Sequence, residues 1–288
     1  MEARKLHDFV PSKIGPVLRA RRLKVLAQST ILAPSYRVAR IPRHDGQWAL
    51  YFVYTPTGQI FDQHIFTIDR LKECGFRVLI VIGSDRLDGE VAEALKMADA
   101  VIIKEERGFD FSGYTIGLNY LVSRFGVFDV LVLNDSVFGP FSDLMPTVTQ
   151  TRWRLTGFTS SQAIENHIQS YAFIFKAMDK ELLASLSSVF FRRVAMSSHG
   201  AVGFLQESRL ARRTSRTCSV GSLWEPLTPL ADLTMAMPIE LVKEGFPFLK
   251  RSLLGKFSFH FSRDDILAVL REKQHPVKSE KLFSGFID

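Results

Sequence analysis

The chain of 288 residues is 46% hydrophobic and 23% charged, which is typical of a folded globular protein and excludes a largely disordered one. Its 37 Lys and Arg exceed its 30 Asp and Glu, and the net charge of +7 favours anionic partners such as nucleotide phosphates, nucleic acid or anionic lipid. The two cysteines are too few for a disulfide scaffold and fit a reducing compartment.

Residues 1–46 form a basic N-terminal extension that ends in the turn-rich segment 42–46. We expect one helix in it, with its basic face in solvent; contact of that face with anionic lipid is the alternative. The extension has no apolar stretch of signal-peptide length, and no later run approaches the roughly 20 apolar residues of a membrane span. The sequence therefore predicts a cytoplasmic protein, for which any contact with the inner membrane surface is peripheral.

Strands and helices alternate over the next part of the chain. Apolar runs predict strands, and helical spacing predicts the helices between them. The expected strands are 48–54, 76–82, 100–103 and 128–133, and the expected helices are 60–74, 91–97 and a segment around 114–125. This alternation indicates an α/β fold with a mostly parallel sheet flanked by helices.

The second half of the chain is less regular. Strands are expected at 153–158 and 169–175, and a helix at 180–191. No linker or repeat divides the chain, so we predict one domain over 47–257, with an irregular mixed C-terminal half, and a helical tail over 258–288 packed on it.

Polar residues follow three of the expected strands, where an open parallel sheet binds its ligands. Asp135 lies directly after an apolar strand, and a hard oxygen ligand there would hold Mg²⁺ or Mn²⁺ against a diphosphate. The alternative is that Asn134, Asp135 and Ser136 form a local Asx turn or a helix cap. Spacing alone does not decide between the two.

The segment before the helix at 114–125 offers opposite charges about one turn apart. Arg107 would bind a phosphate and Asp110 a ribose hydroxyl, or the two would form a surface salt bridge and a cap. Gly108 permits close approach of the backbone. Further along, His167 would be a metal ligand, a donor contact or a base, or else a structural histidine.

Several site classes are disfavoured because their motifs are missing from the sequence. No glycine-rich dinucleotide fingerprint follows the first expected strand, and there is neither a P-loop nor a nucleophile elbow. The basic cluster at 209–216 has no interleaved aromatic residue, so we expect no nucleic-acid partner.

Four ordered motifs resemble the rhamnan synthesis F family, glycosyltransferase-like proteins of bacterial cell-wall and lipopolysaccharide O-chain assembly. They are the glycine-rich segment 107–114, the Asn-Asp-Ser segment 134–140, the pair of segments 157–159 and 167–171, and the Pro-Phe-Leu-Lys segment 247–250. The resemblance implies a GT-A-like fold, in which Asn134-Asp135-Ser136 is a variant of the metal-binding Asp-x-Asp. Because only one acid is present, Asp135 would need phosphate, water or His167 to complete the coordination of a metal.

The resemblance also implies a function. The chain would be a hexosyltransferase that moves a sugar, rhamnose by family analogy, from a nucleotide-diphosphate sugar to a growing lipid-linked polysaccharide such as an O-antigen. The expected donor-binding residues are Tyr54, Thr55, Gly58, Arg107, Gly108, Asp110, Asn134, Asp135, Ser136 and Gln169. The conceivable bases are Glu165, His167, His199 and Glu207. The alternative is a non-catalytic partner of the same fold that docks on a polysaccharide-assembly complex or on the membrane.

Overall fold

Four parallel strands form the centre of the main sheet. In the computed structural model, which describes residues 3–42, 45–86, 96–226, 232–255 and 261–276, β4 (Trp48–Tyr54) lies between β5 (Arg77–Gly83) and β7 (Phe128–Asn134). β6 (Ala100–Lys104) extends the parallel set from β5. The first six residues of β4 are buried because helices cover both faces of the sheet, which explains the continuous apolar runs. The prediction of an α/β fold is confirmed.

Antiparallel pairs widen the sheet beyond β7. β11 (Ala172–Met178) pairs antiparallel with β7 and with β9 (Leu155–Ser161), and β13 (Val220–Pro226) runs parallel to β9. The short β10 (His167–Ile168) folds back on β9. The complete order is β1-β13-β9-β11-β7-β4-β5-β6-β3, and the sheet is therefore mixed, with parallel pairs at its centre.

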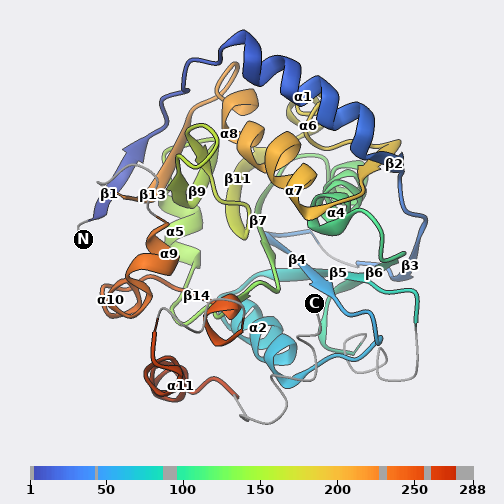
Figure 1. Cartoon of the computed structure of the whole chain (residues 1–288). Helices are drawn as coiled ribbons and strands as arrows, with labels where there is room; N and C mark the ends of the chain where they lie inside the picture. The colour runs from blue at the N-terminus through green and yellow to red at the C-terminus, as the bar shows by residue number, and fades with distance from the viewer. Residues whose placement is uncertain (1–2, 43–44, 87–95, 227–231, 256–260, 277–288) are drawn as a thin grey trace.

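The segment predicted as an N-terminal extension supplies both edge strands. β1 (Ala3–Asp8) pairs with β13, and β3 (Tyr36–Arg40) pairs with β6 at the opposite edge. Between them, α1 (Pro16–Ser29) crosses one side of the molecule. β2 (Thr30–Leu32) then pairs with β12 (Val194–Met196). Figure 1 shows α1 lying across α8 (Ser208–Thr214) and α7 (His199–Val202).

Alternate residues of β4 feed two hydrophobic cores. Trp48, Leu50 and Phe52 point to a core that also holds α4 (Phe109–Phe125), and Ala49, Tyr51 and Val53 point to the other core. On the α4 side lie also α6 (Lys180–Ser185), α7, the π-helix η1 (Gly203–Glu207) and α8. On the opposite side lie α2 (Asp62–Glu73), α5 (Met145–Gln150), α9 (Leu233–Ala236) and α10 (Pro238–Lys243).

A third apolar cluster joins the C-terminal elements to this body. It contains residues of β8 (Val137–Phe138), β14 (Leu249–Lys250), η2 (Arg251–Leu254) and α11 (Arg263–Glu272). β14 pairs antiparallel with β8, which carries residues near position 250 to the end of β7. No helix within the described ranges is long and apolar enough to cross a membrane.

The expected elements are found with shifted ends. The helix expected at 180–191 ends at Ser185, and the strand expected at 153–158 runs from Leu155 to Ser161. The helix expected at 91–97 lies almost wholly outside the described residues, as do parts of the tail predicted at 258–288. The division into extension, domain and tail stays a prediction.

Two glycines let α4 lie directly on β4. A Cβ added at Gly113 would lie 2.3 Å from Phe52, and one at Gly117 would lie 2.4 Å from Leu50. Gly113→Ala is therefore expected to lower the free energy of unfolding by about 1–3 kcal/mol, because the ring of Phe52 must move within a packed core. In the matched control Gly200→Ala the new methyl group meets open space, and we expect a gain of about 0.5–1 kcal/mol. Urea unfolding of both variants measures the difference; equal effects would refute this packing.

Candidate functional site

Polar residues of six segments meet at the carboxyl edge of the parallel strands. β4, β5, β6 and β7 all end at this edge, and the antiparallel β11 begins there, since Ala172 pairs with Leu133. The three loops chosen from the sequence are therefore on the same side of the sheet as the residues that precede β11. The π-helix η1 and the end of β14 complete the surroundings.

Asp110 and Asn134 are joined by a hydrogen bond. The Nδ2 of Asn134 donates to Oδ2 of Asp110 over 2.9 Å, and the backbone N–H of Phe111 donates to Oδ1 over 2.8 Å. The Oδ1 of Asn134 accepts from the backbone N–H of Ser136 at 3.1 Å and from its hydroxyl at 2.5 Å. Asn134 and Ser136 thus form the Asx-type turn that the sequence offered as one alternative, and this turn fixes the position of Asp110.

Glu207 is held on the other side of the same region. Its Oε1 accepts hydrogen bonds from the backbone N–H of Ser170 at 2.7 Å and from the Ser170 hydroxyl at 2.9 Å. The hydroxyl of Tyr114, one turn after Asp110 on α4, donates to the carbonyl of Ser170 over 3.0 Å. Glu207 ends a π-helix, a distortion that proteins often place at functional sites.

The two carboxylates influence each other. Burial raises the pKa of Asp110 to about 6, and the negative charge of Glu207 adds to this effect. Hydrogen bonds from Phe111 and Asn134 and the charge of His199 oppose the rise. A carboxyl group with a pKa near neutrality can exchange a proton under physiological conditions, as a general acid or base must.

A half-buried lysine, Lys250 at the end of β14, lies near the same carboxylates. Burial lowers the pKa of Lys250, and the carboxylates of Asp232, Glu207 and Asp110 oppose the decrease. Its ammonium group lies 4.1 Å from the ring centroid of Tyr171. Asp232 accepts a hydrogen bond from Nε2 of Gln169 at 2.8 Å. We call Asp110, Glu207, Asp232 and Lys250 the carboxylate–lysine cluster.

Asp135, the predicted metal ligand, is paired with an arginine. Its Oδ2 accepts from Nη1 of Arg251 at 3.1 Å and from the backbone N–H of Tyr54 at 3.3 Å. Burial raises the pKa of Asp135, and the charge of Arg251 opposes the rise. His64 lies 3.8 Å away, but burial lowers its pKa to about 3, so its ring is neutral.

This donor set does not fit a divalent ion well. Oδ2 of Asp135 already pairs with the cationic Arg251, whose charge would repel a divalent ion. The side-chain amide of Asn134 donates to Asp110, and the hydroxyl of Ser136 donates to Asn134. Within the described residues no group of three or more His, Cys, Asp or Glu side chains is placed to hold a metal. The assignment of Mg²⁺ or Mn²⁺ to Asp135 stays a prediction.

Lys104, which the sequence did not single out, organises the loop before α4. Its buried ammonium donates to the carbonyls of Glu105, Glu106 and Arg107 at 2.7, 3.3 and 2.9 Å, and burial lowers its pKa to about 8. Gly108 caps α4 with φ of 90°, and a Cβ there would lie 2.7 Å from Ala195. The requirement for glycine at this position is thus conformational and steric.

The remaining residues expected to bind the nucleotide-sugar donor lie at the rim of the site. Arg107 is exposed and forms a 2.7 Å ion pair with Glu105 rather than with Asp110. Tyr54 is 47% exposed, whereas Thr55 is buried and bonds to Gln59 across a turn that contains Gly58. Tyr54 and Arg107 are therefore accessible to a ligand, although each already contacts a glutamate, and Thr55 and Gly58 shape the loop after Tyr54.

Two of the expected bases are placed away from this cluster. Glu165 is buried and forms ion pairs with Arg22 and Arg212, which join α1 to α8. His167 bonds through Nδ1 to the carbonyl of Glu165 at 2.6 Å, and no contact within the described residues joins it to Asp135. His199 packs on Phe109 and lies close enough to lower the pKa of Asp110. Among the expected bases, the structure brings Glu207 and His199 to Asp110.

Lys250, Arg251 and Asp232 are not among the residues predicted for the site. Lys250 ends the Pro-Phe-Leu-Lys motif, which was used only as a mark of resemblance, and Arg251 follows it directly. The available signal was a basic pair directly after the apolar Phe248 and Leu249, and Phe248 is buried against Phe158 and Tyr171. Asp232 had no such signal.

Residues 78–210 match the family model described as rhamnan synthesis protein F. The match confirms the resemblance inferred from the motifs and includes Asp110, Asn134, Ser170 and Glu207. The virulence protein VirA of Vibrio anguillarum is 28% identical over 148 residues, which are 50% of this chain and 47% of VirA. The chain thus spans about half the length of the curated relatives that it matches.

Similar solved structures are distant. The inositol-1-phosphate CTP transferase from T. maritima is 12% identical, with a TM-score of 0.37 over 70% of this chain and 99% of that chain. HddC from Yersinia pseudotuberculosis is 8% identical, with a TM-score of 0.32 over 47% of this chain and 78% of that chain. These likenesses are weak, and the α/β class rests on the strand order of the chain itself.

Proposed function

We propose, from the match of residues 78–210 to rhamnan synthesis protein F, that the chain is a glycosyltransferase of bacterial cell-surface polysaccharide synthesis. It would take a sugar, rhamnose by family analogy, from a nucleotide-diphosphate sugar and add it to a growing chain such as an O-antigen. By the same analogy the acceptor would be lipid-linked, and the reaction would take place at the cytoplasmic face of the inner membrane. These assignments follow from family analogy, whereas the reaction mechanism is argued from the residues of the site.

The observation that carries the proposal is the pair Asp110 and Glu207 at the carboxyl edge. In the transfer, the bond between the sugar C1 and the diphosphate oxygen breaks, a bond to the acceptor oxygen forms, and the acceptor proton must leave. Asp110, with a pKa of about 6, is ionised at neutral pH and would take that proton. Glu207, held by Ser170, would tune the basicity of Asp110 and orient the acceptor.

Cationic side chains near the same edge would stabilise the departing diphosphate. Lys250 belongs to the carboxylate–lysine cluster, and the next residue, Arg251, pairs with Asp135. Fixed cations near a leaving diphosphate lower the energy of the developing charge. Tyr54 and Arg107 would contact the nucleotide from the rim, and Thr55, Gly58 and Gly108 would shape the loops around it. No step of this mechanism passes through a divalent ion.

The test is a binding screen of the full chain against nucleotide-diphosphate sugars by calorimetry, with and without Mg²⁺ or Mn²⁺. We expect one donor to bind, and Arg107→Gln to weaken that binding by about three- to tenfold because one charge-assisted contact is lost. Arg124→Gln, at the far end of α4, is the matched control and should bind as the wild type does. A folded protein that binds none of the donors contradicts the proposal.

A non-catalytic partner of the same fold is the second candidate. The pairing of Asp135 with Arg251 favours it, because the two charges compensate each other within the protein and neither needs a ligand for that. Such a partner would dock on a polysaccharide-assembly complex or the membrane through its basic surfaces. This candidate predicts that the protein is folded and that it binds no nucleotide-diphosphate sugar in the screen.

A further inference from the structure

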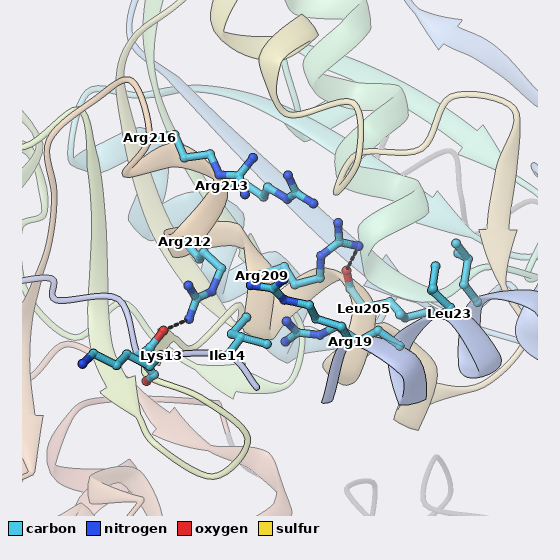
Figure 2. A pocket seen from close by; sticks show the side chains of 12 residues that line it. Lys13, Ile14, Arg19, Leu23, Leu205, Arg209, Arg212, Arg213 and Arg216 are labelled. Atoms are coloured by element: carbon cyan, nitrogen blue, oxygen red, sulfur yellow. Dashed lines mark hydrogen bonds between the residues drawn. The ribbon is translucent and has the colours of Figure 1, made fainter. Parts of the chain in front are cut away.

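A cavity of about 730 Å³ lies between α1 and α8. Figure 2 shows the side chains that line it, which come from α1 and the segment before it, and from η1, α8 and the turn after α8. The cationic lining residues are Arg19, Arg22, Arg209, Arg212, Arg213 and Arg216, with Lys13 at one side. Like charges gathered in one cavity repel each other, and the repulsion is strong where solvent is partly excluded.

One buried carboxylate partly neutralises this cavity. Glu165 pairs with Arg22 and Arg212 and is itself only 1% exposed at its side chain. No carboxylate of the described residues forms an ion pair with Arg209, Arg213 or Arg216. Burial and the charges of Arg213 and Arg22 lower the pKa of Arg209 to about 10, as expected for a cation among cations. The cavity therefore keeps a large excess of positive charge.

Hydrogen bonds hold several of these arginines in place. The Nη1 of Arg209 donates to the carbonyl of Leu205 at 3.1 Å, and Arg212 donates to the carbonyl of Ser12. Arg22 donates to the hydroxyl of Ser208 at 3.1 Å, while its buried Nε has no partner among the described residues. These contacts use only part of the donor capacity, so oriented N–H groups remain for an anion.

We propose that this arginine cavity is a binding site for an anion with two or more phosphate charges, such as a diphosphate group. Arginines bind phosphate oxygens through paired N–H donors, and a diphosphate would offset several of the repulsions at once. Aliphatic side chains also line the cavity, namely Ile14, Leu23, Leu26 and Leu205. The organic part of a phosphorylated ligand can therefore lie on an apolar wall beside the guanidinium groups.

This site is separate from the proposed reaction centre. α8 follows Glu207 directly, so one continuous segment carries Glu207 toward Ser170 and the arginines toward α1. The inference does not rest on sugar transfer. Glu207→Gln is expected to leave anion binding in the arginine cavity unchanged, and failure of the glycosyltransferase proposal would leave this one standing.

Calorimetric titration of the full chain with inorganic diphosphate tests the site at fixed ionic strength. Arg213→Gln combined with Arg216→Gln is expected to weaken binding by about tenfold or more, because two cations near the ligand are removed. The control combines Arg192→Gln with Arg193→Gln, two exposed arginines outside the lining, and should change affinity by less than about twofold. The exposed single variant Arg216→Gln covers the case in which the double variant does not fold.

A second arm identifies the source of the phosphate. The same proteins are sedimented with phosphatidylcholine vesicles that contain phosphatidic acid, and with phosphatidylcholine vesicles alone. Loss of diphosphate affinity in the cavity variants without vesicle binding assigns a free phosphorylated molecule, and parallel loss of acidic-vesicle binding assigns a lipid headgroup. The proposal is overturned if neither probe binds or if cavity and control variants lose affinity equally. It is also overturned if the cavity variants lose affinity for duplex DNA, titrated in the same way, but not for diphosphate or vesicles.

Discussion

Asp110→Asn is expected to reduce kcat for sugar transfer by about 10² to 10⁴-fold while donor affinity stays nearly constant. The substitution removes the ionised oxygen that would accept the acceptor proton but keeps the shape of the side chain. Glu181→Gln, an exposed carboxylate on α6, is the matched control and should keep the full rate. An Asp110→Asn protein with wild-type turnover would remove Asp110 from the mechanism.

The pH profile gives this prediction a second readout. Because the base must be ionised, kcat/KM should fall as pH decreases through about 6, the pKa to which burial raises Asp110. Removing the negative charge of Glu207 by Glu207→Gln should move this limb toward lower pH, since that charge helps to raise the pKa of Asp110. The limb is measured on whatever activity the variant retains. A limb that stays in place would show that Glu207 does not act on the titrating group.

Glu165→Gln is expected to destabilise the protein by about 3–5 kcal/mol, because the guanidinium groups of Arg22 and Arg212 would be left buried without a counter-charge. The change should also loosen α1, which the two ion pairs connect to α8. Urea unfolding measures the first effect, and amide hydrogen exchange over residues 16–29 measures the second. Glu165 would then be a structural residue and not a catalytic base.

The matched control for Glu165 is Glu73→Gln, which breaks an exposed ion pair with Arg70. Exposed pairs contribute little, so we expect a change of less than about 1 kcal/mol. If Glu165→Gln proved no more destabilising than this control and yet lost transfer activity, the carboxylate would belong to the reaction after all.

The parallel centre of the sheet could be predicted because its strands are buried on both faces. The expected strand at 48–54 coincides with β4, since every residue but the last is buried and the run is uniformly apolar. The edge strands were missed for the opposite reason. Leu6, Tyr36 and Val38 are exposed, so β1 and β3 lack a pattern of burial, and β1 pairs with β13 across more than two hundred residues of sequence.

The part of the site formed by loops after parallel strands could be predicted from the sequence, but the contacts from segments far away in the sequence could not. The loops with Asp110 and Asn134 do meet, because parallel strands end at one edge. The neighbours of these residues come from elsewhere: β11 runs antiparallel and brings Ser170, and β14 brings Lys250 and Arg251. Spacing in the sequence carries no information on such encounters, so it does not predict the pairing of Arg251 with Asp135.

The most direct test of the central claim is a hydrogen-exchange footprint of the bound donor. With the nucleotide sugar that the screen identifies, we predict slower exchange in residues 54–58, 105–113 and 134–136, the loops at the carboxyl edge of the sheet. Exchange over residues 62–73 of α2 should be unchanged and serves as the internal reference. Protection confined to other segments, with none in these three loops, would contradict a donor site at this edge.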